Sequence, residues 1–340
     1  MASTFYRGAL GVAFKVVVSV SLTASLFYTG IDLGQIGSHW REIRWGFLFL
    51  VTPVVFAINT GISVIRWGIV LGRQGVHVSF WPLVAIYTKG TILGSFAPGG
   101  LFSGDLYRMY SIAKRTGRTT ISVSSVLTDR AMGVFALLIC SASAFYYAVW
   151  SSGAQPPLAL AKPVVFATGV FFLVLVAAVA LIKYGLTRVN SDRSVISKLQ
   201  RSLHTVPNYF SDKTTLGQIF VLSLLLQLGI VLWTYALSLS MSVRIPLPIL
   251  CMTVPLINLF ALLPVSIGGF GVREAAFVFF LTPFEVKPSE AVSISLLGAV
   301  FQNGLLILTW FSLSCVLHDD PSRIPTHPSW LRSRKEQPAD

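Results

Sequence analysis

An arginine and a glutamate lie side by side in a strongly apolar part of this sequence. They are Arg273 and Glu274, within the segment PVSIGGFGVREAAF at residues 264–277. Arginine binds phosphate through a planar, bidentate fork, whereas a glutamate can bind an amino group, pair with an arginine or carry a coupled proton. Because charges at membrane depth are costly and usually mark function, we expect this pair to belong to a site for a phosphate-bearing ligand.

Three glycines just before this pair predict a break in a helix. Gly268, Gly269 and Gly271 can adopt backbone conformations that a helix forbids. A new helix would begin near Val272, with its free backbone N–H groups and the positive end of its dipole facing a cavity. Unwound backbone is tolerated in lipid only where it is buried in protein or lines such a cavity. The alternative is a tight interhelical turn with both charges at the water interface.

Two more acid–arginine combinations occur in apolar surroundings earlier in the chain. Asp129 and Arg130 come early in the apolar segment 121–149, where a rise of 1.5 Å per residue places them roughly 12 Å into the membrane. Asp105 and Arg108 open a segment that follows a Pro-Gly-Gly break. These four residues join the candidate site.

Helix geometry suggests which of these charges pair. Residues i and i+1 do not face each other on a helix, so Arg273 and Glu274 are not expected to form a closed local pair. Their natural partners are the opposite members of Asp129–Arg130, which would give a crossed cluster of four charges. The alternative is that this cluster is a structural clasp between two halves of the protein, and for Asp129–Arg130 the two roles are weighed equally.

Composition indicates the broad class of the protein. Of its 340 residues, 54% are hydrophobic and 11% are charged, and the mean hydropathy is +0.73. Apolar blocks long enough to span a bilayer, about 20 residues each, cover most of the chain. This predicts an all-α polytopic integral membrane protein. The net charge of +13 is typical of basic cytoplasmic loops beside anionic headgroups, and we expect no nucleic-acid partner.

Sequence motifs for enzymatic chemistry are missing. The three cysteines form no CxxC pair and the five histidines form no HExxH motif or cluster, so we expect no bound metal and no cofactor. The apolar blocks contain no obvious nucleophile–base pair, and no GxxxxGK[ST] phosphate loop occurs. We therefore expect a transport protein rather than an enzyme, driven by gradients or by consumption of its product.

Six segments are predicted to cross the membrane fully, and two to re-enter it as broken helical hairpins. The hairpins, 81–118 and 247–283, enter from opposite sides. The six spans are about 10–29, 45–65, 121–149, 161–183, 216–240 and 289–317. This arrangement places most basic residues and both termini on the cytoplasmic side of the cell inner (plasma) membrane. The alternative is eight full spans. Arg66 and Trp67 are predicted to be an interfacial pair at the end of the second span.

The two hairpins resemble each other, which suggests a weak inverted repeat within a single transmembrane domain, 1–318. Each has an apolar arm, a Gly-rich break and a helix that opens with an acid and an arginine. Matching breaks in two halves, about 1–150 and 161–318, are typical of a central transport site. The polar tail, 319–340, is predicted to be disordered. Lys89 is expected to snorkel toward headgroups, and three polar residues to hydrogen-bond between helices: Gln227, Gln302 and Asn303.

Three segments of the chain resemble one known family. PVSIGGFGVREAAF is similar to the late signature of the lysylphosphatidylglycerol synthase transmembrane-region family, and PGGLFSGDLYRMY and SSVLTDRAMGVFAL resemble its two earlier landmarks. The resemblance covers about residues 8–317, with an aspartate at Asp129 where a glutamate would be expected. It implies a membrane domain that, in full synthases, moves aminoacylated phosphatidylglycerol between leaflets. Those synthases also carry a soluble aminoacyl-transferase domain, and only a short tail follows the last span here, so synthase activity is not expected.

The resemblance and the residues together predict a translocase for a membrane lipid or lipid-linked headgroup. Its substrate would be an anionic or aminoacylated phospholipid, or a polyprenyl-phosphate-linked molecule, and its partners would be membrane lipids. The alternatives are a secondary transporter of a small soluble anion and a scaffold subunit of a lipid-modifying glycosyltransferase or synthase. A lateral opening of the cavity toward the bilayer would favour lipid, whereas a closed aqueous vestibule would favour a solute. The oligomeric state is left open.

Overall fold

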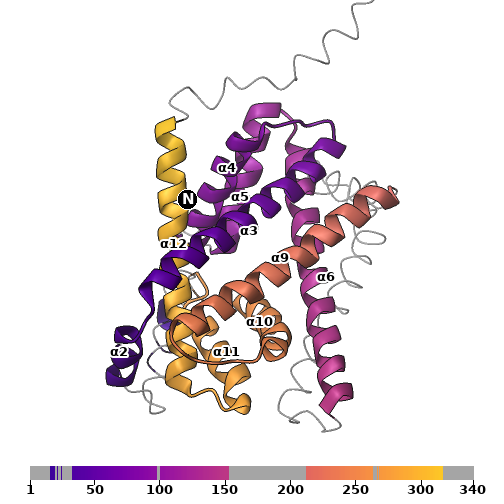
Figure 1. Ribbon diagram of the computed structural model, residues 1–340. Helices are drawn as coiled ribbons and strands as arrows, with labels where there is room; N and C mark the ends of the chain where they lie inside the picture. Colours follow the sequence, from indigo (N-terminus) through magenta and orange to yellow (C-terminus); the bar gives the residue numbers. More distant parts are fainter. Residues whose placement is uncertain are drawn as a thin grey trace, which may run out of the picture.

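The computed structural model describes residues 33–97, 100–152, 212–262, 266 and 268–316, and a few positions near the N-terminus: 16–19, 21 and 24. These residues form helices and contain no strand (Figure 1). The elements are α2 (Leu33–Arg41), α3 (Trp45–Arg73), α4 (Phe80–Phe96), α5 (Leu101–Thr116), α6 (Thr119–Ser152), α9 (Lys213–Ser240), α10 (Leu247–Ala261), α11 (Val272–Leu281), the short 3₁₀ helix η2 (Thr282–Phe284) and α12 (Pro288–Val316).

Four of these helices are long and apolar enough to cross a bilayer: α3, α6, α9 and α12. They correspond to four of the six predicted spans and confirm the all-α polytopic membrane fold. The predicted span at 161–183, the tail at 319–340 and most of the span at 10–29 lie outside the described residues. The second span does not end before Arg66, as the sequence suggested, because α3 continues to Arg73.

Two pairs of short helices form hairpins between the long ones. Helices α4 and α5 pack against each other, as do α10 and α11. The ten residues of α11 extend about 15 Å, half the thickness of the hydrocarbon core, so α11 cannot cross a bilayer. Figure 1 shows the α4–α5 pair in the upper part of the bundle and the α10–α11 pair in the lower part. This arrangement favours two opposed re-entrant hairpins over eight full spans.

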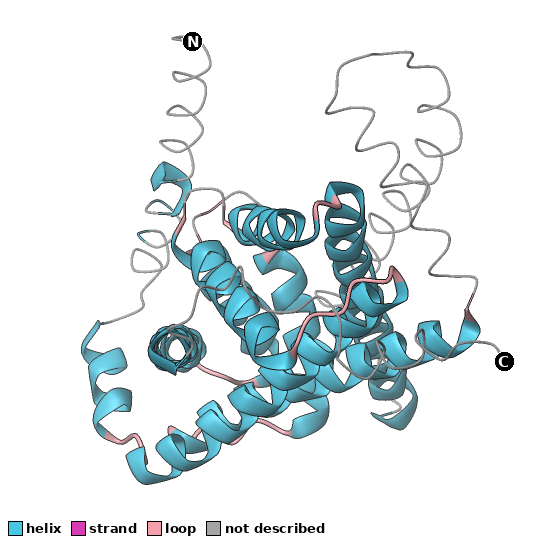
Figure 2. Ribbon diagram, turned by 90° about the horizontal axis from the view of Figure 1, so that it is seen from above, coloured by secondary structure: helices cyan, strands magenta, loops and turns pink. Residues whose placement is uncertain are grey.

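The order and the packing of the helices are the same in the two described halves. Each half runs long helix, two short helices, long helix. Helix α6 packs on α5 of its own half and on α10 of the other, and α12 packs on α11 of its own half and on α4 of the other. Helices α3 and α9 pack on each other. Since α12 is seen almost end-on from above (Figure 2), it runs along the vertical direction of Figure 1 and reaches both hairpins.

Each hairpin has its own apolar core. Trp67, Leu83 and Ile112 are fully buried or nearly so in the core that includes α4 and α5. Leu256 and Phe280 are equally buried in the core that includes α10 and α11. The polar side chains described below lie between these two cores, where the hairpins meet.

A salt bridge joins the end of α3 to the start of α9. Asp212 caps α9, accepting hydrogen bonds from the backbone N–H groups of Thr214 and Thr215, and it also pairs with Arg73. The hydrogen bond from the Thr215 hydroxyl holds the pKa of Asp212 below its usual value, helped by the backbone donors and by Arg73.

Helices α4 and α5 come close to each other at two glycines, Gly90 and Gly104. A Cβ atom added to Gly104 would overlap the carbonyl oxygen of Gly90. Gly104→Ala is therefore expected to destabilise the protein by about 1–3 kcal/mol, as overpacked cores do, measured by thermal unfolding in detergent. Gly61→Ala is the matched control, since no atom lies within 4 Å of a Cβ added at that position in α3. The close crossing would be contradicted if the two variants unfolded at the same temperature.

Candidate functional site

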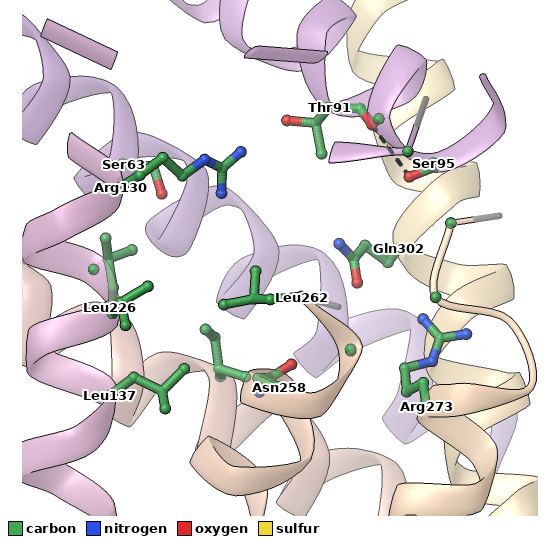
Figure 3. Close-up of a pocket in the computed structure, with 18 of the residues that line it drawn as sticks. Ser63, Thr91, Ser95, Arg130, Leu137, Leu226, Asn258, Leu262, Arg273 and Gln302 are labelled. Atoms are coloured by element: carbon green, nitrogen blue, oxygen red, sulfur yellow. Dashed lines mark hydrogen bonds between the residues drawn. The ribbon is translucent and has the colours of Figure 1, made fainter. Parts of the chain in front are cut away.

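A cavity of about 330 Å³ lies where the two hairpins meet. Its walls come from α3, α4, α6, α9, α10 and α12, from the first turns of α5 and α11, and from the breaks that precede these two helices. Several polar side chains line it, some of which are seen in Figure 3: Ser63, Arg66, Asp129, Arg130, Gln227, Asn258, Arg273, Gln302 and Asn303. A site of this size and polarity can hold the headgroup of a lipid or a small molecule.

Two arginines enter the cavity from different halves of the chain. Figure 3 shows Arg130 on one wall and Arg273 on the opposite side. Both nitrogens of the Arg130 fork donate to the carboxylate of Asp105, from Nε to Oδ2 and from Nη2 to Oδ1, each at 2.8 Å. The side chain of Arg130 nevertheless remains 41% exposed, against 18% for Arg273. Donors of both guanidinium groups are thus available to a ligand in the cavity.

Asp129 precedes Arg130 in α6 and is almost completely buried, with 2% of its side chain exposed. Arg66 of α3 donates to its Oδ1 from Nε at 2.9 Å, and Arg108 of α5 donates to its Oδ2 from Nη2 at 3.0 Å. The Arg108 guanidinium also lies over two aromatic rings, 4.1 Å from the centroid of Trp67 and 4.8 Å from that of Tyr87. This network satisfies a buried carboxylate with two charges, which such a group requires in a membrane.

Glu274 closes the start of α11. Its Oε2 accepts from the backbone N–H of Gly271 at 2.6 Å, and its Oε1 accepts from the Ser295 hydroxyl at 2.8 Å. Arg273 donates to the same Oε1 from Nη2 at 3.1 Å and to Ser295 from Nε at 3.1 Å. Carboxylates are favoured at helix N-termini, and here Glu274 also fixes the position of Arg273.

The predicted crossed cluster of four charges is wrong. Arg130 pairs with Asp105 rather than with Glu274, and Asp129 pairs with arginines of its own half. The prediction that Arg273 and Glu274 form no local pair is also wrong. Neighbours diverge inside a helix, but Glu274 turns back toward the free N–H groups of the first turn, where the long arginine side chain can reach it.

Arg66 is the site residue that the sequence reasoning missed. It was predicted to lie at the water interface with Trp67, yet both side chains are buried. The available signal was the apolar run WGIVLG after Arg66, which carries the helix one to two turns further into apolar surroundings. A buried carboxylate such as that of Asp129 also requires a positively charged partner, which here comes from another helix.

The two helix breaks meet at the cavity. Gly268, Gly269 and Gly271 all have positive φ angles, which confirms the predicted break, and α11 begins at Val272 as expected. A Cβ atom on Gly268 would overlap the carbonyl oxygen of Ser95 at the end of α4. Glycine is therefore required at this position both by its backbone conformation and by the close approach of the opposite hairpin.

The predicted site residues divide into two groups. Five line the cavity: Asp129, Arg130, Gly268, Gly269 and Arg273. The other four are not part of the lining. Two of them bind lining residues and two fix the break before α11: Asp105 and Arg108, and Gly271 and Glu274. With Arg66 included, the cluster contains four arginines and three carboxylates, so it carries one net positive charge. Among the described residues, no group of three or more His, Cys, Asp or Glu side chains could hold a metal ion.

The chain matches the model of a known protein family. The family model described as "Lysylphosphatidylglycerol synthase TM region" matches residues 12–309. The chain belongs to this family. The match includes every charged residue of the cavity and both hairpins, so the site lies within the part of the chain that defines the family. Comparisons with curated proteins and with solved structures found no match.

Proposed function

We propose that this protein moves a phosphate-bearing membrane lipid, or a lipid-linked headgroup, between the two leaflets of the plasma membrane. The observation that carries the proposal is the pair of arginines, Arg130 and Arg273, on opposite sides of one cavity between opposed hairpins. Two guanidinium forks in a cluster with one net positive charge suit a single anionic phosphate ester. Anionic or aminoacylated phospholipids and polyprenyl-phosphate-linked molecules all have this group.

Exposed side chains in the cavity lining favour a lipid over a soluble anion. Phe102 lines the cavity in the first turn of α5 and is 62% exposed, and Gln302 in the middle of α12 also lines it and is exposed. Both are far from the ends of their hairpin or helix, which supports a cavity that opens toward the bilayer at membrane depth. A lipid could place its headgroup inside while its acyl chains stay in the bilayer.

The exchanged packing of the two halves supports the transport part of the proposal. Each hairpin packs on the last helix of the other half, as in an inverted repeat whose halves move against each other around a central site. In this proposal, the residues 1–318 form one transmembrane domain with both termini in the cytoplasm, and the protein needs no catalytic group. A lipid-modifying enzyme that supplies or consumes the lipid is the partner that this role implies.

The test is lipid movement in vesicles that contain only the purified protein. Fluorescent phosphatidylglycerol, its lysyl ester, a polyprenyl-phosphate sugar and phosphatidylcholine are each placed in both leaflets, and the fraction accessible to an outside quencher is followed over time. Selective movement of one phosphate-bearing lipid supports the proposal and names the headgroup. If an intact, folded protein moves none of them but takes up a soluble anion, the lipid assignment is wrong. If it moves neither, a scaffold role replaces it.

A further inference from the structure

Lys89 is a cation at membrane depth that the cavity does not use. It lies in the middle of α4, two residues from Tyr87 and two from Thr91, which both line the cavity. Two residues correspond to a rotation of roughly 200° around a helix, so Lys89 is on the opposite face of α4. No ion pair or hydrogen bond to a carboxylate is found for it within the part of the chain that the structure describes.

Two aromatic rings flank this lysine. Its Nζ lies 5.3 Å from the ring centroid of Tyr107 on α5 and 5.8 Å from that of Trp310 on α12. Helices α5 and α12 both pack on α4, so the Lys89 ammonium lies between an aromatic ring of α5 and one of α12. Cation–π contacts of this kind stabilise a lysine only partly and leave its other donor directions free.

Apolar side chains near these two rings are exposed. Three large hydrophobic residues close to Tyr107 on α5 and to Trp310 on α12 are 62–64% exposed: Leu106, Tyr110 and Phe311. Such surfaces face the acyl chains of a bilayer. An ammonium group between them needs an anion that can be reached from the lipid, and a phospholipid supplies one together with acyl chains that contact these side chains. The snorkelling predicted from the sequence gives Lys89 no defined ligand, whereas the aromatic contacts fix its position.

We propose that Lys89, Tyr107 and Trp310 form a second binding site, for the phosphate of an anionic phospholipid on the outer surface of the α4–α5 hairpin. The site is one helix thickness from the cavity and is separate from it. Lys89 supplies the charge, and the two rings hold its side chain and pack against the lipid glycerol and upper acyl chains. This inference concerns binding and does not depend on the transport activity proposed above.

Trp310 provides a direct measurement of this site. The full chain is reconstituted into phosphatidylcholine vesicles that contain either phosphatidylglycerol or phosphatidylcholine brominated on its acyl chains, because bromine quenches a tryptophan that it contacts. The difference between the protein and its Trp310→Phe variant isolates the Trp310 signal from the other tryptophans. We expect stronger quenching of Trp310 by the brominated anionic lipid than by the zwitterionic one at equal mole fraction. Equal quenching by the two lipids overturns the proposal. This measurement requires no variant of Lys89.

Substitutions then assign the preference to the lysine. Lys89→Gln is expected to reduce the anionic-lipid preference at Trp310 about fivefold, the usual contribution of one lysine near an anionic membrane, whereas Lys89→Arg keeps it. Lys114→Gln removes the same charge from the exposed last turn of α5 and should leave the preference unchanged. Arg273→Gln should also leave it unchanged, which separates this site from the cavity. A preference that survives in Lys89→Gln, or that is lost in Arg273→Gln, contradicts the assignment.

Discussion

Asp129→Ala is expected to destabilise the protein by about 3–5 kcal/mol, the usual cost of removing one partner from a buried ion pair. The substitution leaves the Arg66 guanidinium without a carboxylate and leaves Arg108 with only the more distant Asp105, 3.6 Å away. Both side chains are more than nine-tenths buried, so water cannot replace the lost oxygen atoms. Unfolding by denaturant in detergent micelles, followed by tryptophan fluorescence, measures the effect.

Two further variants separate the ion pair from simpler explanations. Asp129→Glu keeps the carboxylate and should cost much less, because the arginine side chains can adjust by one methylene. Arg130→Ala also removes a charge next to Asp129, but it leaves both guanidinium partners of Asp129 in place, so it should cost less than Asp129→Ala. If Asp129→Ala were no less stable than Arg130→Ala, the buried network would not be a main source of stability.

The network shows how much of the site can be predicted from the sequence. The charged residues stand out because each interrupts an apolar block, and Asp105, Arg108, Asp129 and Arg130 were found in this way. Their pairing could not be predicted. Asp129 binds Arg66, which is 63 positions earlier, and only the packing of α3 against α6 brings the two together. Local spacing on one helix says nothing about such a contact.

The fold was predicted more completely than the pairing. Helix lengths and glycines are local properties, so the break before Val272 and the short α11 followed directly from the sequence. The opposed hairpins followed from charge, because only that arrangement keeps most basic residues on one side. The predicted end of α3 is too early because the ion pair between Arg66 and Asp129 cannot be predicted from local sequence. An arginine normally marks the membrane–water interface, but an arginine can be buried when an acidic residue from another helix binds it.

Arg130→Gln and Arg273→Gln are each expected to slow lipid movement about 10–100-fold, with the protein still folded. A hydrogen bond to a charged group contributes about 1.5–3 kcal/mol, and each variant removes one guanidinium fork from the cavity. Both side chains are partly exposed, so unfolding temperatures should change far less than for Asp129→Ala. Initial rates in the vesicle assay, measured for the lipid that the wild type moves best, give the result.

The controls for these variants test whether a fork is needed rather than a charge. Arg130→Lys and Arg273→Lys keep the charge but cannot bind a phosphate through two parallel donors, so they should recover only part of the rate. Arg244→Gln removes one positive charge from an exposed turn between α9 and α10, and it should move lipid at the wild-type rate. If both cavity variants also did so, the arginines would be a structural clasp between the hairpins. The ligand would then have to bind elsewhere, since the third arginine that lines the described cavity, Arg66, is bound to Asp129.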